Sequence, residues 1–237
     1  MTTLFAIDTA ADRCNLALSC EAQVALLSGP TGHTHIEHVL PLIDKLFAQC
    51  DIGPEQCDAF AFASGPGAFT GLRVACTIAQ GLALGTGRPV IPIGNLLALA
   101  SACDALLPPE PVARRAFVAI DARMQQAYWG VYEGAGTDWV ELAAPALCKV
   151  DAMSELINRW QADFCGGDAD WLERSLGACA VPICHGLVDG GALARLAAVR
   201  FAAGAVLPAR AALPAYVRDE VARTVAERRQ DARGPSA

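Results

Sequence analysis

Apolar residues in the first fifty positions follow two different periods. Short apolar runs at 4–10, 13–20 and 22–27 predict three strands, close enough in sequence to form an antiparallel meander. Across 35–50, apolar residues recur at i, i+3, i+4 and i+7, which predicts a helix. Pro41 lies inside this pattern and indicates either a first-turn position or a local kink.

The next stretch combines a buried strand, a glycine-rich turn and a helix. The apolar run 58–63 predicts the strand, and the Ala/Leu-rich segment 74–85 predicts the helix. Between them lies Ser64–Arg73, with the sequence SGPGAFTGLR. Gly65 and Gly67 allow backbone angles that other residues avoid, and Pro66 stiffens the turn. We expect Thr70 to cap the helix, and the turn to suit an anion or a close helix–sheet contact.

The second half of the chain resembles a weaker copy of the first. Three prolines within 108–111 indicate a boundary, after which 116–121 repeats an apolar strand that ends in aspartate, as at Asp8. We therefore expect a duplicated α/β fold with two lobes. The predicted divisions are a first lobe at 1–107, a reduced second lobe at 108–222 and a charged tail at 223–237. The remaining pattern predicts strands at 90–93, 127–133, 139–142, 164–167 and 181–184, and helices at 95–106, 151–160, 191–203 and 219–229.

Composition narrows the class of protein. The formal net charge of −7 over 237 residues argues against a stand-alone nucleic-acid binder, although 195–237 holds eight Arg against four Asp or Glu. That basic end would contact an acidic partner or RNA, or form a solvated helix. Hydrophobic residues make up 54% of the chain, which suggests an apolar surface covered by another subunit. Ten scattered cysteines without a C-x-x-C pair, in a chain without a signal peptide, indicate a reduced, cytoplasmic protein. No apolar stretch has the length needed to cross a membrane, so no membrane span is expected.

Candidate phosphate chemistry centres on the glycine-rich turn and on two aspartates. The turn is not a Walker A loop, because no Lys follows Gly71 at the required place. Asp8 and Asp121 could position a metal ion and water at a phosphate. This arrangement resembles the site of actin-like ATPases, which usually have glycine two residues after each such aspartate so that the backbone can approach the phosphates, but this chain has Ala10 and Arg123 there. Both aspartates therefore also fit a structural role in turns.

Other constellations indicate packing rather than chemistry. His33, His35 and His38 have neither an H-E-x-x-H spacing nor a third ligand at clear spacing, so no metal site is predicted. Small residues recur at four-residue steps from Gly71 to Ala83, which permits close helix contact in a core or with a partner.

Six segments in order resemble one known family. They are AIDTA (6–10), HIEHVLPLID (35–44), SGPGAFTGLR (64–73), AQGLALG (79–85), AIDARMQQAYWGVY (119–132) and PAYVRDEVA (214–222). This combination resembles the TsaB (YeaZ) family, bacterial subunits of the tRNA threonylcarbamoyladenosine (t6A) machinery. The resemblance implies an actin-like ATPase fold (ASKHA, ribonuclease-H-like) with mixed sheets flanked by helices in two lobes.

The resemblance also implies a partner and a role. Family members bind the larger paralogue TsaD, with the ATPase TsaE, and support threonylcarbamoyl transfer to the adenosine beside the anticodon of ANN-decoding tRNAs. We therefore expect no catalytic residues, tRNA contact only through the complex, and homodimers when the protein is alone. The expected partner-binding residues lie on the helices 35–50 and 70–85: Ile36, Val39, Leu40, Ile43, Phe47, Gly71, Leu72, Ala75, Ala79 and Ala83.

Residual nucleotide binding is a separate expectation. No cofactor is expected in the isolated chain, but the resemblance leaves room for ATP or ADP at the junction of the complex. Residues for a remaining anion or nucleotide site would be Asp8, Gly65, Gly67, Thr70 and Asp121. The alternative function is an independent actin-fold ATPase or small-molecule kinase that uses Asp8 and Asp121. The paralogue's metal site is not carried over, because Gly94–Leu99 contains no histidine.

Overall fold

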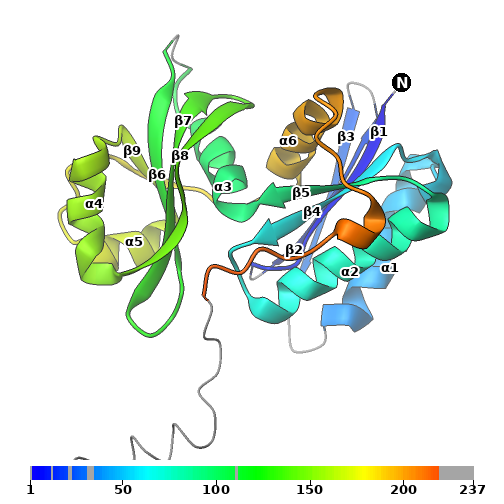
Figure 1. Ribbon diagram of the computed structural model, residues 1–237, viewed down its shortest axis with the longest axis horizontal. Coiled ribbons are helices and arrows are strands. Elements are labelled where there is room, and N and C mark those ends of the chain that lie inside the picture. The colour runs from blue at the N-terminus through cyan, green and yellow to red at the C-terminus, as the bar shows by residue number, and fades with distance from the viewer. Residues whose placement is uncertain (1, 12, 21–22, 31–34, 110–111, 219–237) are drawn as a thin grey trace, which may run out of the picture.

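A computed structural model describes residues 2–11, 13–20, 23–30, 35–109 and 112–218. The side chains of Pro30 and of residues 35–37 are outside this description. In the described part of the chain, two five-stranded sheets form two lobes, with helices between the sheets and on their outer faces (Figure 1). The expected α/β architecture with two lobes is confirmed.

The first sheet has the order β3-β2-β1-β4-β5. Strands β1, β2 and β3 pair antiparallel, which confirms the meander, while β4 and β5 add in parallel. Pro41 is an interior residue of its helix, not a first-turn residue. The elements of this half are β1 (Thr3–Asp8), β2 (Arg13–Cys20), β3 (Gln23–Pro30), α1 (His35–Cys50), η1 (Pro54–Gln56), β4 (Ala59–Gly65), α2 (Phe69–Thr86), β5 (Val90–Gly94) and α3 (Asn95–Asp104).

The second sheet repeats the topology of the first. Its order is β10-β9-β6-β7-β8, so β6 takes the place of β1 and β9 that of β4. This correspondence confirms the duplication expected from the two strand-ending aspartates. The elements are β6 (Arg114–Asp121), β7 (Gln126–Ala135), β8 (Asp138–Lys149), η2 (Val150–Ala152), α4 (Met153–Trp160), β9 (Phe164–Gly167), α5 (Ala169–Leu176), β10 (Ile183–His185), α6 (Gly190–Ala202) and η3 (Ala209–Ala211).

Two elements of this half differ from the sequence prediction. Strand β8 is three times as long as the predicted 139–142, because it lies at the sheet edge, where Pro145 costs no ladder hydrogen bond. Helix α5 was not predicted at all. Its signal is Asp168, whose side chain caps the helix by accepting a hydrogen bond from the Trp171 N–H at 2.8 Å.

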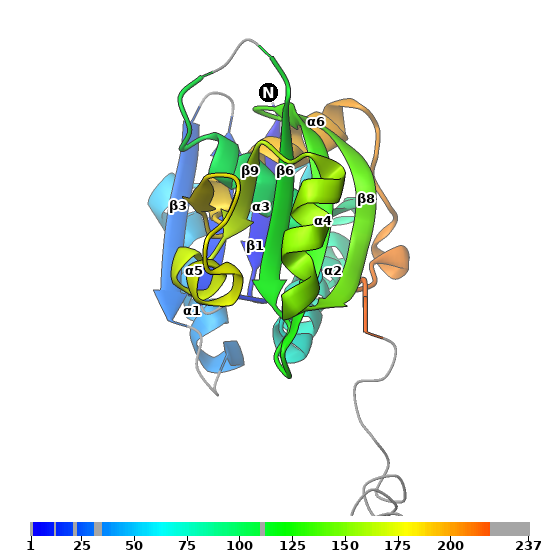
Figure 2. The same ribbon diagram turned by 90° about the vertical axis from the view of Figure 1, so that its left-hand side faces the viewer.

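Side-chain size alternates along the central strands. Phe60 and Phe62 of β4 point to the outer face, where α1 and α2 cover them. The intervening alanines at 59, 61 and 63 point to the inner face, into the core that both sheets share with α3 and α6. Small side chains on the inner face let these two helices fit between the sheets. Figure 2 shows the arrangement from the side of the second lobe.

Each of the two helices between the sheets packs mainly on the sheet that it does not follow in the sequence. Helix α3 follows the first sheet but packs mainly on β6, β7 and β9, whereas α6 follows the second sheet but packs on β1, β2, β4 and β5. Helix α6 and residues 207–212 therefore pack with the first sheet although they fall inside the predicted lobe 108–222, and the predicted division of the chain stays a prediction. The predicted tail 223–237 and the predicted helix 219–229 lie outside the described residues.

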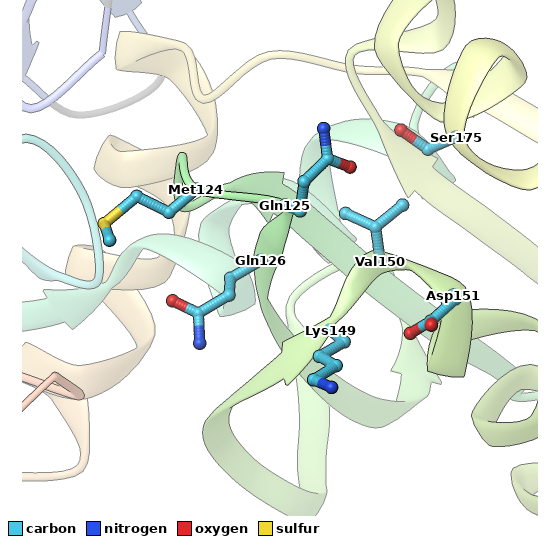
Figure 3. A pocket seen from close by; sticks show the side chains of 7 residues that line it. All are labelled: Met124, Gln125, Gln126, Lys149, Val150, Asp151 and Ser175. Carbon is cyan, nitrogen blue, oxygen red and sulfur yellow. The ribbon is translucent and has the colours of Figure 1, made fainter. Parts of the chain in front are cut away.

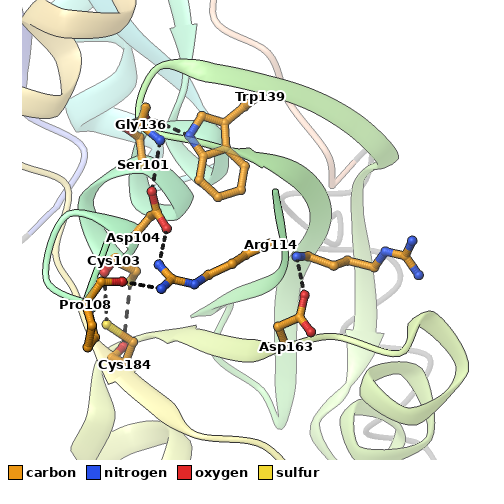
Figure 4. A network of polar contacts seen from close by, with 10 residues as sticks. Ser101, Cys103, Asp104, Pro108, Arg114, Gly136, Trp139, Asp163 and Cys184 are labelled. Carbon is orange, nitrogen blue, oxygen red and sulfur yellow. Dashed lines mark hydrogen bonds and ion pairs between the residues drawn. The ribbon is translucent and has the colours of Figure 1, made fainter. Parts of the chain in front are cut away.

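The chain crosses between the lobes near the predicted proline boundary. The Arg114 guanidinium, at the start of β6, donates to the Asp104 carboxylate at 2.7 Å and to the Pro108 carbonyl (Figure 4). Asp104 also accepts the Gly136 N–H at 2.9 Å. These contacts tie the end of α3 to the start of β6 and to the turn between β7 and β8.

All ten cysteines of the chain lie in the described residues, and none of them forms a disulfide. Burial raises the pKa of the Cys14 and Cys57 thiols to about 12, so both stay protonated at neutral pH. Within the described ranges, no helix has the length and apolar character needed to cross a membrane.

Candidate functional site

The first candidate residue, Asp8, ends β1 and is fully buried. One carboxylate oxygen, Oδ1, accepts the Ala10 N–H at 2.7 Å, which makes a tight turn. The other oxygen, Oδ2, has no hydrogen-bond partner among the described residues. Burial raises the pKa of Asp8 to about 6, because the charged form loses its hydration.

The glycine-rich turn is packed directly against the Asp8 turn. A Cβ at Gly71 would lie 1.9 Å from the Thr9 carbonyl oxygen, so only glycine fits there. The Thr9 hydroxyl donates to the Gly71 carbonyl at 2.6 Å, and the Ala68 N–H donates to the Ala10 carbonyl at 3.0 Å. The two turns therefore hold each other through backbone contacts.

The other two glycines of the turn also face protein. The Gly65 N–H donates to Asn95 Oδ1 at 2.7 Å, and a Cβ at Gly65 would lie 2.3 Å from the Ala215 carbonyl oxygen. A Cβ at Gly67 would lie 2.9 Å from the Ala10 Cβ. Of the two roles left open by the sequence, close packing is the one these distances support.

The expected helix cap at Thr70 is wrong. Helix α2 begins at Phe69 and its N-cap is Ala68, which makes no side-chain cap hydrogen bond. Thr70 is exposed in the first turn. The helix begins two residues early because the contacts of Ala68 and Gly71 with the Asp8 turn fix its first turn.

The second aspartate, Asp121, makes the same local turn in different surroundings. Its Oδ1 accepts the Arg123 N–H at 2.7 Å, as Asp8 does with Ala10. Asp121 is exposed, however, and its Oδ2 pairs with the Arg123 guanidinium at 3.2 Å. Arg123, Met124 and Gln125 all have left-handed backbone angles, with φ of 63°, 56° and 57°. Three such residues in a row are costly without glycine.

An open hollow of about 560 Å³ lies beside this second turn. Figure 3 shows its lining residues, which come from the turn after β6, the start of β7, the end of β8, η2 and helix α5. They are Met124, Gln125, Gln126, Lys149, Val150, Asp151 and Ser175. Neither Asp8 nor the glycine-rich turn lines this hollow. The hollow is therefore not the site that Asp8 and Asp121 were expected to form together.

A segment near the end of the described chain connects the two turns. This segment, residues 207–218, is called the strap below. It pairs with the edge strand β5 at Leu207 and Val90, then receives a hydrogen bond from Gln80 of α2 at the Ala209 carbonyl, at 2.9 Å. Its Ala215 N–H donates to the Ser64 carbonyl at 2.7 Å.

The strap ends on the second lobe. The Arg218 guanidinium donates to the Ala122 carbonyl at 3.0 Å and to Gln126 Oε1 at 2.6 Å. It also lies 5.8 Å from the Tyr128 ring centroid. The strap therefore passes from the glycine-rich turn to the Asp121 turn (Figure 1), a link that no local sequence pattern predicted.

The residues expected to bind a partner are mostly core residues of the first lobe. Ile36 lies in α1, but its side chain is outside the described part. Leu40 is half exposed, at 50%. The other eight point inward onto the sheet and its neighbouring turns, where they are buried: Val39, Ile43, Phe47, Gly71, Leu72, Ala75, Ala79 and Ala83. The apolar stripe of each helix therefore packs on its own lobe, and a role of these eight in partner binding stays a prediction.

The outer faces of α1 and α2 present different residues. On α2, the exposed positions Phe69, Arg73, Thr77 and Gly81 follow one another at four-residue steps, and Leu84 continues them with 64% of its surface exposed. Leu40 contributes an apolar side chain from α1, which lies beside α2 on the same side of the sheet (Figure 1). Together with the exposed Gly85 of α2, these residues are called the α1/α2 face below.

The histidines do not form a metal site in the described part. His38 is exposed on α1, His33 lies outside the described residues, and the side chain of His35 is not described. Among the described residues, no three His, Cys, Asp or Glu side chains come together in a metal-binding arrangement.

Comparisons with known proteins agree with the architecture. Residues 30–166 match the family model described as "TsaD: tRNA N6-adenosine threonylcarbamoyltransferase". The chain is 39% identical over 169 residues to the tRNA threonylcarbamoyladenosine biosynthesis protein TsaB of Haemophilus influenzae, covering 68% of this chain and 69% of that one. It is 28% identical over 231 residues to TsaB of Escherichia coli, covering 92% and 96%.

Solved structures give the same result. YeaZ from Pseudomonas aeruginosa superposes with a TM-score of 0.77 at 31% identity, covering 91% of this chain and all of that chain. An inorganic polyphosphate/ATP-glucomannokinase from Arthrobacter superposes with a TM-score of 0.53 at 13% identity, covering 86% of this chain. The second likeness concerns the fold alone.

Proposed function

Because this chain belongs to the TsaB family of tRNA threonylcarbamoyladenosine biosynthesis proteins, we propose that it is a non-catalytic subunit of t6A formation. It would dock on TsaD through the α1/α2 face, and TsaE would join the assembly. In this role it supports threonylcarbamoyl transfer to the adenosine beside the anticodon, and it meets tRNA only within the complex.

The observation that carries the proposal is the composition of the α1/α2 face. Gly81 and Gly85 are exposed within α2, and a Cβ at either position would meet nothing within 4 Å. Each glycine costs a helix about 1 kcal/mol relative to alanine, and no internal contact requires it here. Close approach of another chain to the helix backbone would explain both, and the exposed Leu84 beside them supplies apolar contact.

The surroundings of the aspartates support a non-catalytic role. The space next to the Asp8 turn is filled by the Ala10 methyl group and the glycine-rich turn, whose N–H groups at Gly65 and Ala68 are already bonded within the chain. The Asp121 carboxylate is paired with its own Arg123. A phosphate would have to displace these contacts before either aspartate could act on it.

Binding to TsaD tests the proposal. Leu84→Glu should weaken the complex at least about 30-fold, because burying a leucine contributes about 1.5–3 kcal/mol and the new carboxylate must be desolvated. Val140→Glu is the matched control, since Val140 is 60% exposed but lies on β8 of the second lobe. Equal co-elution of both variants with TsaD on size exclusion would contradict the α1/α2 assignment. Ala79 is unsuitable for this test, because it is fully buried and a charge there would unfold the lobe.

The alternative is an independent ATPase or small-molecule kinase. One observation favours it: the buried Asp8 carboxylate has an oxygen without a partner in the described chain. Calorimetry of the isolated protein with Mg-ATP separates the two functions. Tight binding with turnover that Asp8→Asn abolishes would support the enzyme, whereas nucleotide binding that appears only with TsaD would place it at the subunit junction.

Pairing of two copies is a further part of the proposal. Without TsaD, the same α1/α2 face would associate with a second copy. Sedimentation of the wild-type protein and the Leu84→Glu variant should then show a dimer only for the wild type.

A further inference from the structure

An arginine in the first turns of α2 lies over one aromatic ring and beside a second. The Arg73 guanidinium lies 3.7 Å from the Phe69 ring centroid and 5.9 Å from that of Tyr216. Its Nε donates to the Tyr216 hydroxyl at 2.9 Å. The two rings themselves are 5.2 Å apart, so three side chains form one cluster at the surface.

This cluster fixes a side chain that is normally flexible. A free arginine loses considerable rotamer freedom when it binds, but here stacking on Phe69 and the Nε hydrogen bond have already restricted the guanidinium. The bond to Tyr216 uses Nε alone. Within the described part of the chain, no acceptor binds the two terminal nitrogens of Arg73, and Arg73 belongs to none of the described ion pairs.

Arg73 lies on the α1/α2 face, the surface that would dock on TsaD. Phe69, Arg73 and Thr77 continue the exposed row of α2 that leads to Gly81. Arg73 is also the single charged residue in the 18 residues of this helix. A lone charge at the rim of a face that becomes covered must either stay in water or meet an opposite charge, because desolvating it unpaired is costly.

We propose that Arg73 is a pre-oriented receptor for a carboxylate of the TsaD subunit that docks on the α1/α2 face. The two terminal N–H groups of a guanidinium match the two oxygens of a carboxylate in a bidentate pair. Arg73 would thus set the register of docking at the N-terminal end of α2, while the glycines and Leu84 supply close contact toward the other end. This inference rests on the proposed function.

Tyr216 has a distinct part in this arrangement. It belongs to the strap, 143 residues after Arg73 in sequence, and it touches the arginine rather than the partner's carboxylate. It is therefore a positioning residue. Because the strap also contacts the Ser64 carbonyl and the Asp121 turn, the receptor is assembled only in the folded two-lobed chain.

The experiment measures affinity for TsaD by calorimetry at low and high salt. Arg73→Glu should weaken binding about 100-fold, and Arg73→Lys about 10-fold, because lysine keeps the charge but loses the planar fork. Tyr216→Phe should weaken binding about 3-fold and leave the melting temperature unchanged, since the ring stays and only the bond to Nε is lost. The controls are Arg159→Glu on α4 and Tyr128→Phe on β7, both expected to change affinity less than 2-fold.

A rescue experiment identifies the carboxylate. Exposed Asp and Glu residues of TsaD are changed one at a time to Arg and each is tested against Arg73→Glu. One such variant should restore affinity and the wild-type salt dependence. Unchanged affinity of Arg73→Glu, with Leu84→Glu still disrupting the complex, would overturn the receptor and leave the proposed function intact. Loss of affinity without any rescue would also overturn it, and failure of the wild-type protein to bind TsaD would remove both proposals.

Discussion

The turns after Asp8 and Asp121 are copies of one another that the fold uses differently. Each aspartate ends the first strand of its sheet and accepts the N–H two residues later at 2.7 Å. The first turn is buried beneath the glycine-rich turn, and its carboxylate keeps an oxygen without a partner in the described chain. The second is exposed and paired with its own arginine. Equal local structure therefore does not give equal chemistry, because burial raises the pKa of the Asp8 carboxyl group to about 6.

The largest expected effect breaks the packing of the first turn. Gly71→Ala would place a methyl group 1.9 Å from the Thr9 carbonyl, so the backbone must move, and we expect a loss of about 3 kcal/mol or more in the free energy of unfolding. Gly81→Ala is the matched control on the same helix. There the space is open, and alanine should stabilise the protein by about 1 kcal/mol. Urea unfolding of both variants measures the contrast, and equal losses would contradict the packing role of Gly71.

The second prediction concerns pH. Burial raises the pKa of Asp8 to about 6 in the folded protein, from the ordinary value of 3.8 that applies to the unfolded chain. Between these two pH values the folded state therefore binds more protons than the unfolded state. Wild-type stability should therefore fall as pH rises from about 4 to about 6, by about 3 kcal/mol in total, and not below that window.

Two variants isolate this effect. In Asp8→Asn the pH-dependent loss should disappear, so its stability relative to the wild type should improve between pH 4 and pH 7. Asp121→Asn should change stability by less than about 0.5 kcal/mol at either pH, because its exposed ion pair is weak. Thermal unfolding at both pH values measures this, and a parallel pH response of the two variants would contradict the difference in burial.

A smaller effect is expected from cutting the link between the two turns. Arg218→Ala removes two hydrogen bonds to the second turn and should cost about 2 kcal/mol. Hydrogen exchange should rise at residues 122–126, where those bonds end. Arg210→Ala serves as the control, because Arg210 is exposed on the same strap. Unchanged exchange in Arg218→Ala would show that the strap does not hold the second turn.

The smallest effect tests backbone strain in the second turn. Met124 is exposed and has a φ of 56°, a region that costs an L-residue about 1–2 kcal/mol. Met124→Gly should therefore stabilise the protein by up to about 1 kcal/mol, after the greater entropy of unfolded glycine is subtracted. Leu106→Gly, at an exposed position without a positive φ, should give no gain. A drop in melting temperature for Met124→Gly would contradict the strain.

Much of the fold follows from the sequence alone. The period of the apolar residues located α1 and β2 to the residue, and the strand-ending aspartates revealed the duplication that the strand orders confirm. These features depend on residues close together in the sequence, because the spacing of apolar side chains and the identity of turn residues determine them. The glycine-rich turn was likewise recognised as the junction between a buried strand and a long helix, whereas its place beside Asp8 comes from the parallel pairing of β1 with β4, which the sequence did not predict.

What the sequence could not decide depends on contacts between distant residues. Helix α6 was assigned to the second lobe because it follows that sheet, but the alanines of the first sheet's inner face receive it. The apolar stripes of α1 and α2 looked like a docking surface until the fold buried them, which left Leu84, Gly81 and Arg73 outside. The glycine-rich turn resembled a phosphate loop, and only its contacts with Thr9 and Ala215 gave those glycines a packing role. Periodicity tells which side of a helix is apolar, but only tertiary packing tells what covers it.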